Sequence, residues 1–390
     1  MISIEEARQI IRSHIGKMGS AEASLSDAVG GVLAADVVSD GHYPSGDRST
    51  MDGYVIRGDE EPGDFQVIGE IPAGAVPGES LAKGQALRIF TGALIPEGGG
   101  RVIMQEDTHR DGDTVHIGHF QENRCIRPKG SEAKPGGIVL PAGTVLGAAE
   151  IAILAQVGVV HPRLVRRPVI RHLATGNELV APGESPGPGQ IRDTNSSLLA
   201  ALIKGQGINL TDSTRVADDP SALAGIAEGE WDLLLVSGGA SVGDYDFGAE
   251  ALRRLGFTIH FDRVNLRPGK PLTFATRGHQ AAFVIPGNPV SHFVCYHVAI
   301  RLAVELSAGL PETWNELPLE IDGGEPVNPD PRETFWPARV SIRDGRLRIT
   351  PLRWSTSGDT FSLAGTNALA RVNSTSPAGG LIQTLLLNPI

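Results

Sequence analysis

The spacing of apolar residues predicts a helix at the start of the chain and short strands further on. Apolar side chains recur at helical spacing over 4–11, and Ser3 and Glu6 have the spacing of a capping box. Residues 27–36 repeat this helical spacing and predict a second helix. From about 42 to 124 the pattern changes to short apolar runs bounded by Gly, Pro and Asp, which indicates a small β-rich domain.

A long apolar stretch at 138–160 has to be tested as a membrane span. Pro141 and Gly143 interrupt it near its start. Glu150 would lie near the middle of the bilayer, at a cost of about 2 kcal/mol or more. The stretch is therefore expected to form a turn, a buried helix over about 147–156 and a following strand.

Between 166 and 310 the pattern alternates between strand and helix. Such alternation is typical of βαβ units, so we expect a mainly parallel sheet with the active crevice outside the carboxyl ends of its strands. The expected strands cover 168–175, 210–216, 232–236, 259–264, 272–276 and 282–285. The expected helices follow Asn195, Asp219 and Asp246, and a long one covers 290–308.

These patterns together predict an α/β protein of several domains. Its parts are an N-terminal helical and mixed unit formed by 1–41 and 125–165, a β-rich insert at 42–124, an α/β domain at 166–310 and a C-terminal domain at 311–390. The last part contains several apolar strands and no long helix, so we expect a domain that resembles a β-barrel.

The charge balance of the chain narrows its partners. The 390 residues carry 34 Lys and Arg against 45 Asp and Glu, a formal net charge of −11. Nucleic acid and membrane surfaces require a basic face, so this charge argues against both, and an anionic small molecule must meet a local cationic pocket. Cys125 and Cys295 alone make neither a disulfide framework nor a structural zinc site, and residues 1–6 do not resemble a secretory signal. A cytoplasmic protein is expected.

The segment 232–243 has the pattern of a buried strand that leads into a glycine-rich turn and a helix. Glycines allow backbone N–H groups to turn toward an anion, and the helix N-terminus adds a positive dipole. A plain tight turn is the alternative. The same turn also fits the Gly-x-Ser-x-Gly pattern of α/β-hydrolases, so an esterase stays open, with Ser241 as nucleophile, Asp262 as acid and His279 or His292 as base. No His-Gly-Gly loop precedes the motif, which weakens this hypothesis.

Three cations lie within eight residues of this acidic chain, at Arg263, Arg267 and Lys270. In an extended segment Arg263, Asn265 and Arg267 share one face and can clamp a phosphate or an oxyanion such as molybdate. Alternatively, the three cations bind no ligand and belong to an ordinary solvated surface. The turn at 285–289 contains two prolines, which would hold a loop rigidly at the crevice.

Four carboxylates are candidates for chemistry, at Asp52, Glu178, Asp218 and Asp246. Carboxylates that different loops bring to a phosphate site can hold Mg²⁺ through their oxygen atoms. Each also has a structural interpretation, because Asp218 and Asp246 stand where a residue caps a helix. The helix start at 193–197 could likewise receive an anion or serve only as a cap.

Taken together and in this order, eight segments resemble the molybdopterin molybdenumtransferase family, which includes MoeA and the E domain of gephyrin. Any one motif is weak, but eight in register are strong, and they extend the resemblance to nearly the whole chain. They are Met-Asp-Gly-Tyr at 51–54, Thr-Gly-Ala-Leu-Ile-Pro at 91–96, Arg-Pro-Lys-Gly at 127–130, Thr-Gly-Asn-Glu-Leu at 175–179, Asp-Thr-Asn at 193–195, Ser-Gly-Gly-Ala-Ser-Val-Gly at 237–243, Arg-Pro-Gly-Lys-Pro at 267–271 and Pro-Gly-Asn-Pro at 286–289, with a weaker likeness at Arg339 and 366–369.

The resemblance implies an enzyme of molybdenum cofactor biosynthesis, a molybdopterin molybdotransferase. Its reaction would insert molybdate into adenylated molybdopterin, hydrolyse the adenylate with Mg²⁺, and release AMP and molybdenum cofactor. The α/β domain at 166–310 would bind the molybdopterin. The resemblance also implies a homodimer, in which the β-rich insert of one subunit reaches the crevice of the other, and a transient contact with the molybdopterin adenylyltransferase. A scaffold that only binds the cofactor is the remaining alternative.

Motif by motif, the resemblance assigns roles to individual residues of this chain. The catalytic residues would be Asp52, Thr91, Glu178, Asp218, Asp246, Arg263 and Arg267, and Glu178, Asp218 and Asp246 would also hold the Mg²⁺. The substrate-binding residues would be Asp193, Asn195, Ser237, Gly238, Gly239, Ser241, Lys270, Pro286, Asn288, Pro289, Arg339 and Ser357. The candidate molybdate site combines the segment from Arg267 to Lys270 with Arg339 and Ser357.

Some positions depart from the family pattern. Arg263 and Arg267 stand where lysines are usual, which keeps the charge but replaces a compact ammonium by a planar fork. Ser131 and Glu132 replace the usual Glu-Asp pair, and Ala240 replaces a valine. Molybdate and tungstate both stay open as the oxyanion.

Overall fold

The computed structural model describes residues 1–390 except 79, 217–229, 240–246, 328–329, 375–379 and 388–390. The described chain forms two compact units, one made of residues 1–21 and 165–390 and the other of residues 22–164. The helix expected after Asp219 lies outside the described residues, whereas the helix expected after Asp246 is confirmed as α5 (Phe247–Arg254).

A six-stranded sheet forms the centre of the first unit. Its strand order is β16 (Leu210–Val216), β13 (Ile170–Thr175), β17 (Leu233–Ser237), β21 (Gln280–Ile285), β20 (Thr273–Arg277) and β18 (Thr258–Phe261). The first four strands are parallel, and β20 and β18 continue the sheet in antiparallel pairing. The predicted α/β fold with a mainly parallel sheet is confirmed.

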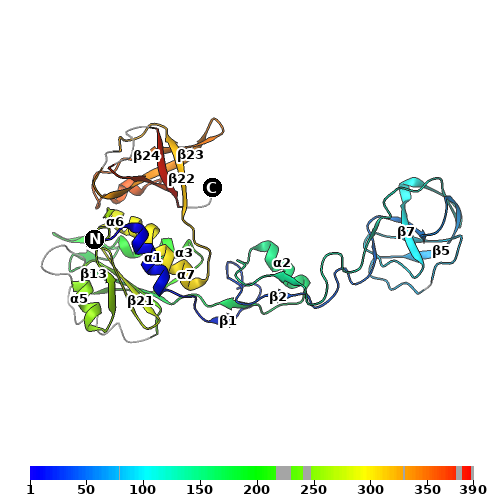
Figure 1. The fold of residues 1–390 in the computed structure, drawn as a ribbon, viewed down its shortest axis with the longest axis horizontal. Coiled ribbons are helices and arrows are strands. Elements are labelled where there is room, and N and C mark those ends of the chain that lie inside the picture. The colour runs from blue at the N-terminus through cyan, green and yellow to red at the C-terminus, as the bar shows by residue number, and fades with distance from the viewer. Residues whose placement is uncertain (79, 217–229, 240–246, 328–329, 375–379, 388–390) are drawn as a thin grey trace. The chain divides into compact units, whose positions relative to one another are not determined.

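Helices cover both faces of this sheet. One face packs against α1 (Ile4–His14), α3 (Asn195–Lys204), α6 (Pro289–Cys295) and α7 (Arg301–Ala308), and the other against α5 (Phe247–Arg254) (Figure 1). Because side chains alternate along a strand, Leu233 and Leu235 of β17 enter the first core, and Leu234 and Val236 enter the second. The carboxyl end of β17 is therefore held by two cores at once.

The helices of this unit follow the expected boundaries closely. At the start of α1, the Ser3 hydroxyl accepts a hydrogen bond from the backbone of Glu6 at 3.1 Å, and the Glu6 carboxylate accepts one from the backbone of Ser3 at 2.7 Å, which confirms the capping box. The helix expected over 290–308 is also confirmed. It runs as α6 and α7, joined by a π-helical segment at Tyr296–Ile300.

The C-terminal part of the first unit is a closed five-stranded barrel, as predicted. It contains β22 (Asn315–Ile321), β23 (Glu333–Arg343), β24 (Arg346–Pro351), β25 (Ala368–Val372) and β26 (Leu381–Leu386), with a short 3-10 helix, η3, at Thr360–Leu363. Pairing of β23 with both β24 and β25 closes the barrel. Trp336 and Val340 fill its interior, whereas Phe335, Leu369 and Leu385 join the core of the α/β sheet. The barrel is thereby packed against the sheet.

The second unit is built mainly from strands. A six-stranded sheet has the order β7 (Gly99–Met104), β4 (Gly53–Arg57), β6 (Gln85–Ile89), β5 (Gly63–Ile71), β9 (Thr114–Ile117) and β8 (Thr108–Asp111), with a 3-10 turn, η1, at Gln105–Asp107. Two small sheets pair β3 (Arg48–Ser49) with β10 (Ile126–Arg127) and β2 (Val37–Val38) with β11 (Ile138–Leu140). The chain passes between the two units at β1 (Ser20–Glu22) and β12 (Arg163–Val165).

The apolar stretch at 138–160 contains α2 (Ala148–Gln156), which confirms a helix over about 147–156. The expectation that this helix is buried is wrong, because Leu154 is its one buried residue, and the next strand, β12, begins only after the stretch, at Arg163. Within the described part of the chain, no helix combines the length and the apolar character that crossing a membrane would require.

The helix predicted over 27–36 is wrong. Gly30 has a φ of 73°, a left-handed conformation that interrupts a right-handed helix. Val32 and Leu33 are instead buried in short bridges to Val145 and Leu164. These apolar residues are spaced so that they are buried against distant strand-like segments. This tertiary pairing overrides the local helical pattern.

Candidate active site

Three parallel strands of the first unit end at one edge of the sheet, and the loops that follow them line a cavity of about 710 Å³. The strands are β13, β17 and β21, whose carboxyl ends stand in register, with Ala174 beside Ser237 and Ser237 beside Ile285. The strand ends and loops contribute Thr175, Gly176, Glu178, Ser237–Gly239 and Gly287–Pro289 to the cavity wall. This is the crevice outside the strand ends that the alternating pattern predicted.

Glycines allow these loops to approach one another. Gly238 has a φ of 91°, and a Cβ atom there would lie 2.6 Å from the Thr175 hydroxyl oxygen. A Cβ atom on Gly176 would lie 2.7 Å from Oε2 of Glu178, so the missing side chain leaves room for that carboxylate. Glu178 is thereby held beside the cavity, between β13 and the short strand β14 (Leu179–Val180).

The start of α3 closes another side of this cavity, after the short strand β15 (Ile191–Arg192). Asp193 is buried and accepts a hydrogen bond from the backbone of Ser196 at 3.0 Å, the geometry of a helix cap. Asn195 donates through Nδ2 to the carbonyl oxygen of Gly287 at 2.7 Å. Its buried Oδ1 has no hydrogen-bond partner within the described residues, so it is available to a donor on a ligand.

Ser237 lies between two buried histidines at the end of β17. The Ser237 hydroxyl oxygen is 2.6 Å from Nε2 of His172 and 2.6 Å from Nε2 of His292. Nδ1 of His292 lies 3.4 Å from the carbonyl oxygen of Asn288, which can only accept, so Nε2 of a neutral His292 must accept the Ser237 proton. His172 then donates to Ser237. Burial lowers the pKa of His172 to about 4 and that of His292 to about 3, so both rings are neutral at pH 7.

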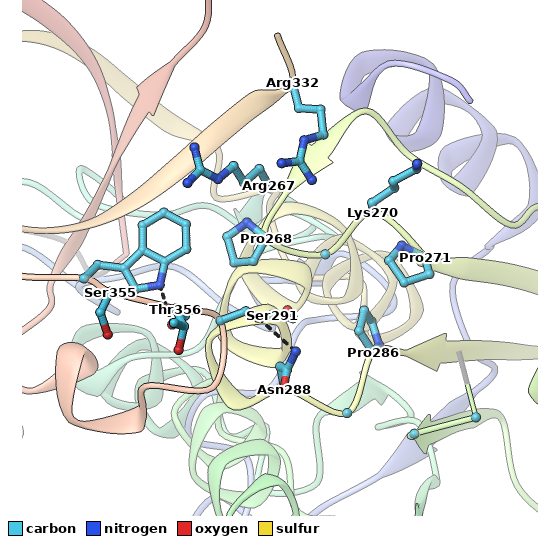
Figure 2. A pocket seen from close by; sticks show the side chains of 16 residues that line it. Arg267, Pro268, Lys270, Pro271, Pro286, Asn288, Ser291, Arg332, Ser355 and Thr356 are labelled. Atoms are coloured by element: carbon cyan, nitrogen blue, oxygen red, sulfur yellow. Dashed lines mark hydrogen bonds between the residues drawn. The ribbon is translucent and has the colours of Figure 1, made fainter. Parts of the chain in front are cut away.

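A second cavity of about 700 Å³ continues from the first and shares Gly238, Gly239, Gly287 and Asn288 with it. Arg267, Lys270 and Arg332 line one side of this second cavity. Figure 2 shows these three side chains on one side, opposite Asn288, Ser355 and Thr356, with the amino group of Lys270 directed away from the two guanidinium groups. We call it the cationic pocket. No carboxylate pairs with Lys270 among the residues that the structure describes.

The two arginines of the cationic pocket share one carboxylate. Asp330 Oδ2 is 2.9 Å from Nη1 of Arg267, and Oδ1 is 3.1 Å from Nε of Arg332. Burial alone raises the pKa of Asp330, but hydrogen bonds from Arg332 and the charge of Arg267 outweigh it, so the pKa is lowered. The Arg267 guanidinium also lies 5.4 Å from the ring centre of Trp354, whose indole N–H donates to the Thr356 carbonyl at 2.7 Å.

The segment after β24 brings Ser357 to the cationic pocket. The Ser357 hydroxyl accepts a hydrogen bond from Nδ2 of Asn288 at 2.9 Å, and its carbonyl oxygen accepts one from the backbone of Val290 at 3.0 Å. The barrel thus supplies one wall, and the loop before α6 supplies the other.

Most residues assigned from the sequence line one of the two cavities. The first cavity contains Glu178, Asp193, Asn195, Ser237, Gly238, Gly239, Asn288 and Pro289, and the cationic pocket contains Arg267, Lys270, Pro286 and Ser357. Arg263 and Arg339 are exposed and line neither cavity. Asp218, Ser241 and Asp246 lie outside the described residues.

Asp52 and Thr91 lie in the second unit, where they bind each other. Oδ1 of Asp52 accepts hydrogen bonds from the Thr91 backbone N–H and from its hydroxyl, both at 2.7 Å. The backbone bond, followed by the hydroxyl bond, lowers the pKa of Asp52. The two residues form one exposed polar pair on loops beside β4 and β6.

Sequence reasoning missed Arg332, Trp354 and Ser291 as residues of the cationic pocket. Arg332 and Trp354 precede and follow barrel strands far along the chain from Arg267, and no spacing pattern links them to it. Ser291 follows the Pro-Gly-Asn-Pro turn by two residues, so its place at the start of α6 was the one signal available.

Among the described residues, the two histidines considered as an esterase base are poorly placed for that role, and Ser241 itself lies outside the described residues. His279 lies in the turn between β20 and β21, at the amino end of β21 and so at the opposite edge of the sheet from the crevice. His292 is fully buried against Ser237. The pKa of His292, lowered to about 3 by burial, also makes it a poor general base.

The described residues contain no group of three or more His, Cys, Asp and Glu that could hold a metal ion. Glu178 is the one proposed Mg²⁺ ligand that the structure describes, and a carboxylate at the cavity wall is the donor type that Mg²⁺ prefers. The donor chemistry of Glu178 therefore fits the ion.

Three sequence families match successive parts of the chain. Their descriptions are MoeA N-terminal region (domain I and II) over residues 2–158, probable molybdopterin binding domain over 171–305, and MoeA C-terminal region (domain IV) over 324–382. The second match covers most of the cavity-lining loops described above.

Named relatives and a solved structure match almost the whole length. A molybdopterin molybdenumtransferase from Nostoc sp. is 36% identical, over 95% of this chain and 89% of the relative. A molybdopterin molybdenumtransferase from Bacillus subtilis is 32% identical, over 94% of this chain and 89% of the relative. The crystal structure of a molybdopterin biosynthesis moeA protein from Pyrococcus horikoshii OT3 superposes with a TM-score of 0.82 at 26% identity, covering 99% of this chain and 100% of that one.

Proposed function

The chain belongs to the molybdopterin molybdenumtransferase family and is an enzyme of molybdenum cofactor biosynthesis, and from that premise we propose its reaction. It inserts molybdate into adenylated molybdopterin and releases AMP and molybdenum cofactor. The observation that carries this proposal is the pair of connected cavities, one lined by glycine-rich loops and the other by three cations. The first cavity would hold a pterin that carries a phosphate chain. The second cavity would hold the oxyanion next to it.

In this proposal the first cavity holds the adenylated pterin. The backbone turn at Gly239, just after β17, suits a phosphate group, because N–H groups in such turns point at an anion, whereas the N–H of Gly238 is already donated to the carbonyl oxygen of Ile285 at 3.0 Å. The unpartnered Oδ1 of Asn195 would accept a hydrogen bond from an amino or ring N–H group of the pterin. The hydrogen bonds of Ser237 with His172 and His292 fix the carboxyl end of β17 beside this cavity.

The cationic pocket would hold the oxyanion. Lys270 supplies a mobile ammonium, and Arg267 and Arg332 supply planar donors suited to a tetrahedral oxyanion. The shared wall at Gly287 and Asn288 would bring the oxyanion close to the reacting end of the pterin. Such positioning lowers the entropic cost of bringing two substrates together.

We propose that the reaction uses Mg²⁺, with Glu178 as one ligand and Asp218 and Asp246 as the others. When bound, the ion would neutralise negative charge that develops on the adenylate phosphate. Glu178 contributes an oxygen at the cavity wall, held beside Gly176. Water would attack the adenylate phosphorus and break its bond to the phosphate of the pterin, so the pterin phosphate would be the leaving group and AMP would carry the oxygen of the water.

Incubation of the purified protein with adenylated molybdopterin, Mg²⁺ and molybdate tests this function. We expect AMP release that depends on molybdate, together with molybdenum cofactor detected by mass spectrometry. A scaffold would bind the adenylate and keep it intact. Adenylate that stays intact at saturating molybdate and Mg²⁺ would therefore refute the transferase.

We also propose that the protein works in the cytoplasm as a homodimer with shared sites. Asp52 and Thr91 form a polar pair in the unit that does not contain the crevice. The family resemblance supports an arrangement in which this pair reaches the crevice of the partner subunit. A transient contact with the molybdopterin adenylyltransferase would pass on the adenylate without release.

A further inference from the structure

Asp330 places a negative charge among the cations of the proposed oxyanion pocket. Its carboxylate contacts Arg267 at 2.9 Å and Arg332 at 3.1 Å, and only 15% of its side chain is exposed. It also accepts a hydrogen bond from the backbone N–H of Arg332 at 2.9 Å. This last bond ties Asp330 to its own loop, so the carboxylate stays in place independently of the arginine side chains.

The fold fixes Arg267 and Asp330 relative to each other. Arg267 is the last residue of β19 (Leu266–Arg267), which pairs in parallel with the start of β23 at Glu333 and Thr334. Asp330 comes three residues before this pairing. The ion pair therefore joins the α/β domain to the barrel. Both arginines line the cationic pocket, and the ring centre of Trp354 lies 5.4 Å from the Arg267 guanidinium.

Asp330 lowers the net positive charge of the cationic pocket. Arg267, Lys270 and Arg332 supply three positive charges, and Asp330 cancels one of them, which leaves two. Hydrogen bonds and arginine charges lower the pKa of Asp330, so the carboxylate is ionised at neutral pH. Lys270 and the Arg267–Asp330–Arg332 cluster together carry the charge that balances a dianion.

We propose that Asp330 is a built-in competitor for the oxyanion, which sets the charge of the pocket to match a dianion and limits how tightly that dianion is held. This inference rests on the proposed oxyanion function of the pocket. A pocket with three uncompensated cations would bind a dianion more tightly and release it more slowly. Tighter ground-state binding does not accelerate the reaction, so the competitor keeps the anion available for transfer.

Two tetrahedral oxyanions of different charge provide the test, molybdate as the dianion and perrhenate as the monoanion. Their dissociation constants are measured by titration calorimetry on the wild type and on Asp330→Asn. Coulomb energy scales with ligand charge, so removing one negative charge should strengthen perrhenate binding roughly threefold and molybdate binding roughly tenfold, the square of the smaller gain. The gain should shrink with added salt.

Three variants control this experiment. Asp330→Glu keeps the charge and should leave the ratio of the two affinities near that of the wild type. Asp322→Asn removes an exposed carboxylate that pairs with Arg343 at the end of β22, so it changes the net charge of the protein equally but far along the barrel from the pocket. Asp330→Ser serves as the second neutral variant, because its hydroxyl can still accept from the backbone of Arg332 if Asp330→Asn folds poorly.

The outcomes separate this inference from the function on which it rests. Weaker binding of both anions in the neutral variants would mean that Asp330 only positions the arginines, and would overturn the proposal. Equal gains for perrhenate and molybdate would overturn it as well. A wild type that binds neither anion would refute the oxyanion pocket itself.

Discussion

The hydroxyl oxygen of Ser237 lies 2.6 Å from Nε2 of His292, inside the protein and directly below the glycine turn of the crevice. His172 approaches the same oxygen from β13. Three secondary-structure elements, β13, β17 and α6, are thereby linked at the point where the two cavities meet. The link depends on neutral imidazoles, since a protonated His292 has no acceptor left at Nε2.

This link predicts a specific loss of stability in acid. Burial lowers the pKa of His172 to about 4, below its value of about 6.5 in the unfolded chain, so the unfolded state binds more protons between these values. The free energy of unfolding should therefore fall as the pH falls from 6.5 toward 4, by about 3 kcal/mol from His172 alone. Urea unfolding followed by tryptophan fluorescence at pH 7 and pH 4.5 measures this change.

Two variants test the source of that acid sensitivity. His172→Gln removes the titrating group and keeps an amide that can donate to Ser237, so its stability should depend less on pH than that of the wild type. His279→Gln removes an exposed imidazole at the opposite end of β21 and should leave the pH dependence unchanged. An equally steep loss in His172→Gln would show that other groups cause it.

The sequence allowed much of the α/β domain to be predicted, because its elements repeat a simple pattern. The strand over 210–216 and the helix over 290–308 were predicted at nearly their observed bounds. The failure over 27–36 has a local cause, since Gly30 adopts a left-handed conformation and Leu33 pairs with Leu164 across more than a hundred residues. Apolar spacing does not encode such distant pairing.

In the candidate site, too, residues of one short motif could be predicted, whereas residues brought together by distant pairing could not. Arg267 and Lys270 stand in one short motif and were found by composition, whereas Arg332 and Asp330 meet them only because β19 pairs with β23. The environment of Ser237 was equally hidden. His172 and His292 lie on different elements, and nothing in their sequence spacing indicates that both contact one hydroxyl group.

The second prediction concerns Lys270, the cation of the pocket without a carboxylate partner among the described residues. Lys270→Ala should weaken molybdate binding about ten- to a hundredfold, since a charge-assisted contact contributes roughly 1.5–3 kcal/mol. Lys270→Arg keeps the charge and should lose less. Arg346→Ala, an exposed cation on β24, controls for net charge. Calorimetric dissociation constants that do not differ between Lys270→Ala and Arg346→Ala would remove Lys270 from the site.

The third prediction concerns shared sites. If Asp52 acts in the crevice of the partner subunit, Asp52→Ala and Asp246→Ala homodimers should both be inactive, and mixing them should restore activity. A mixed dimer contains one crevice with both acids intact, so up to about half of the dimers formed would carry one working site. The recovered activity is measured as AMP release after the two variants are refolded together. Light scattering measures whether the protein is a dimer. A fully active monomer, or a mixture without recovery, would contradict the shared site.

The last prediction separates the transferase from the esterase through Ser241. An esterase uses the Ser241 hydroxyl as its nucleophile, so Ser241→Ala would abolish turnover and a fluorophosphonate probe would label the wild type. In the transferase water attacks the adenylate, and Ser241→Ala removes at most one neutral contact, about 1 kcal/mol or several-fold in rate. Turnover should instead collapse with EDTA or in Asp246→Ala, because both remove the neutralisation of developing phosphate charge. Mass spectrometry of the probe-treated protein and AMP release by each variant decide the matter. A covalent adduct on Ser241 would favour the hydrolase, and AMP release that ignores EDTA would favour a metal-free transferase.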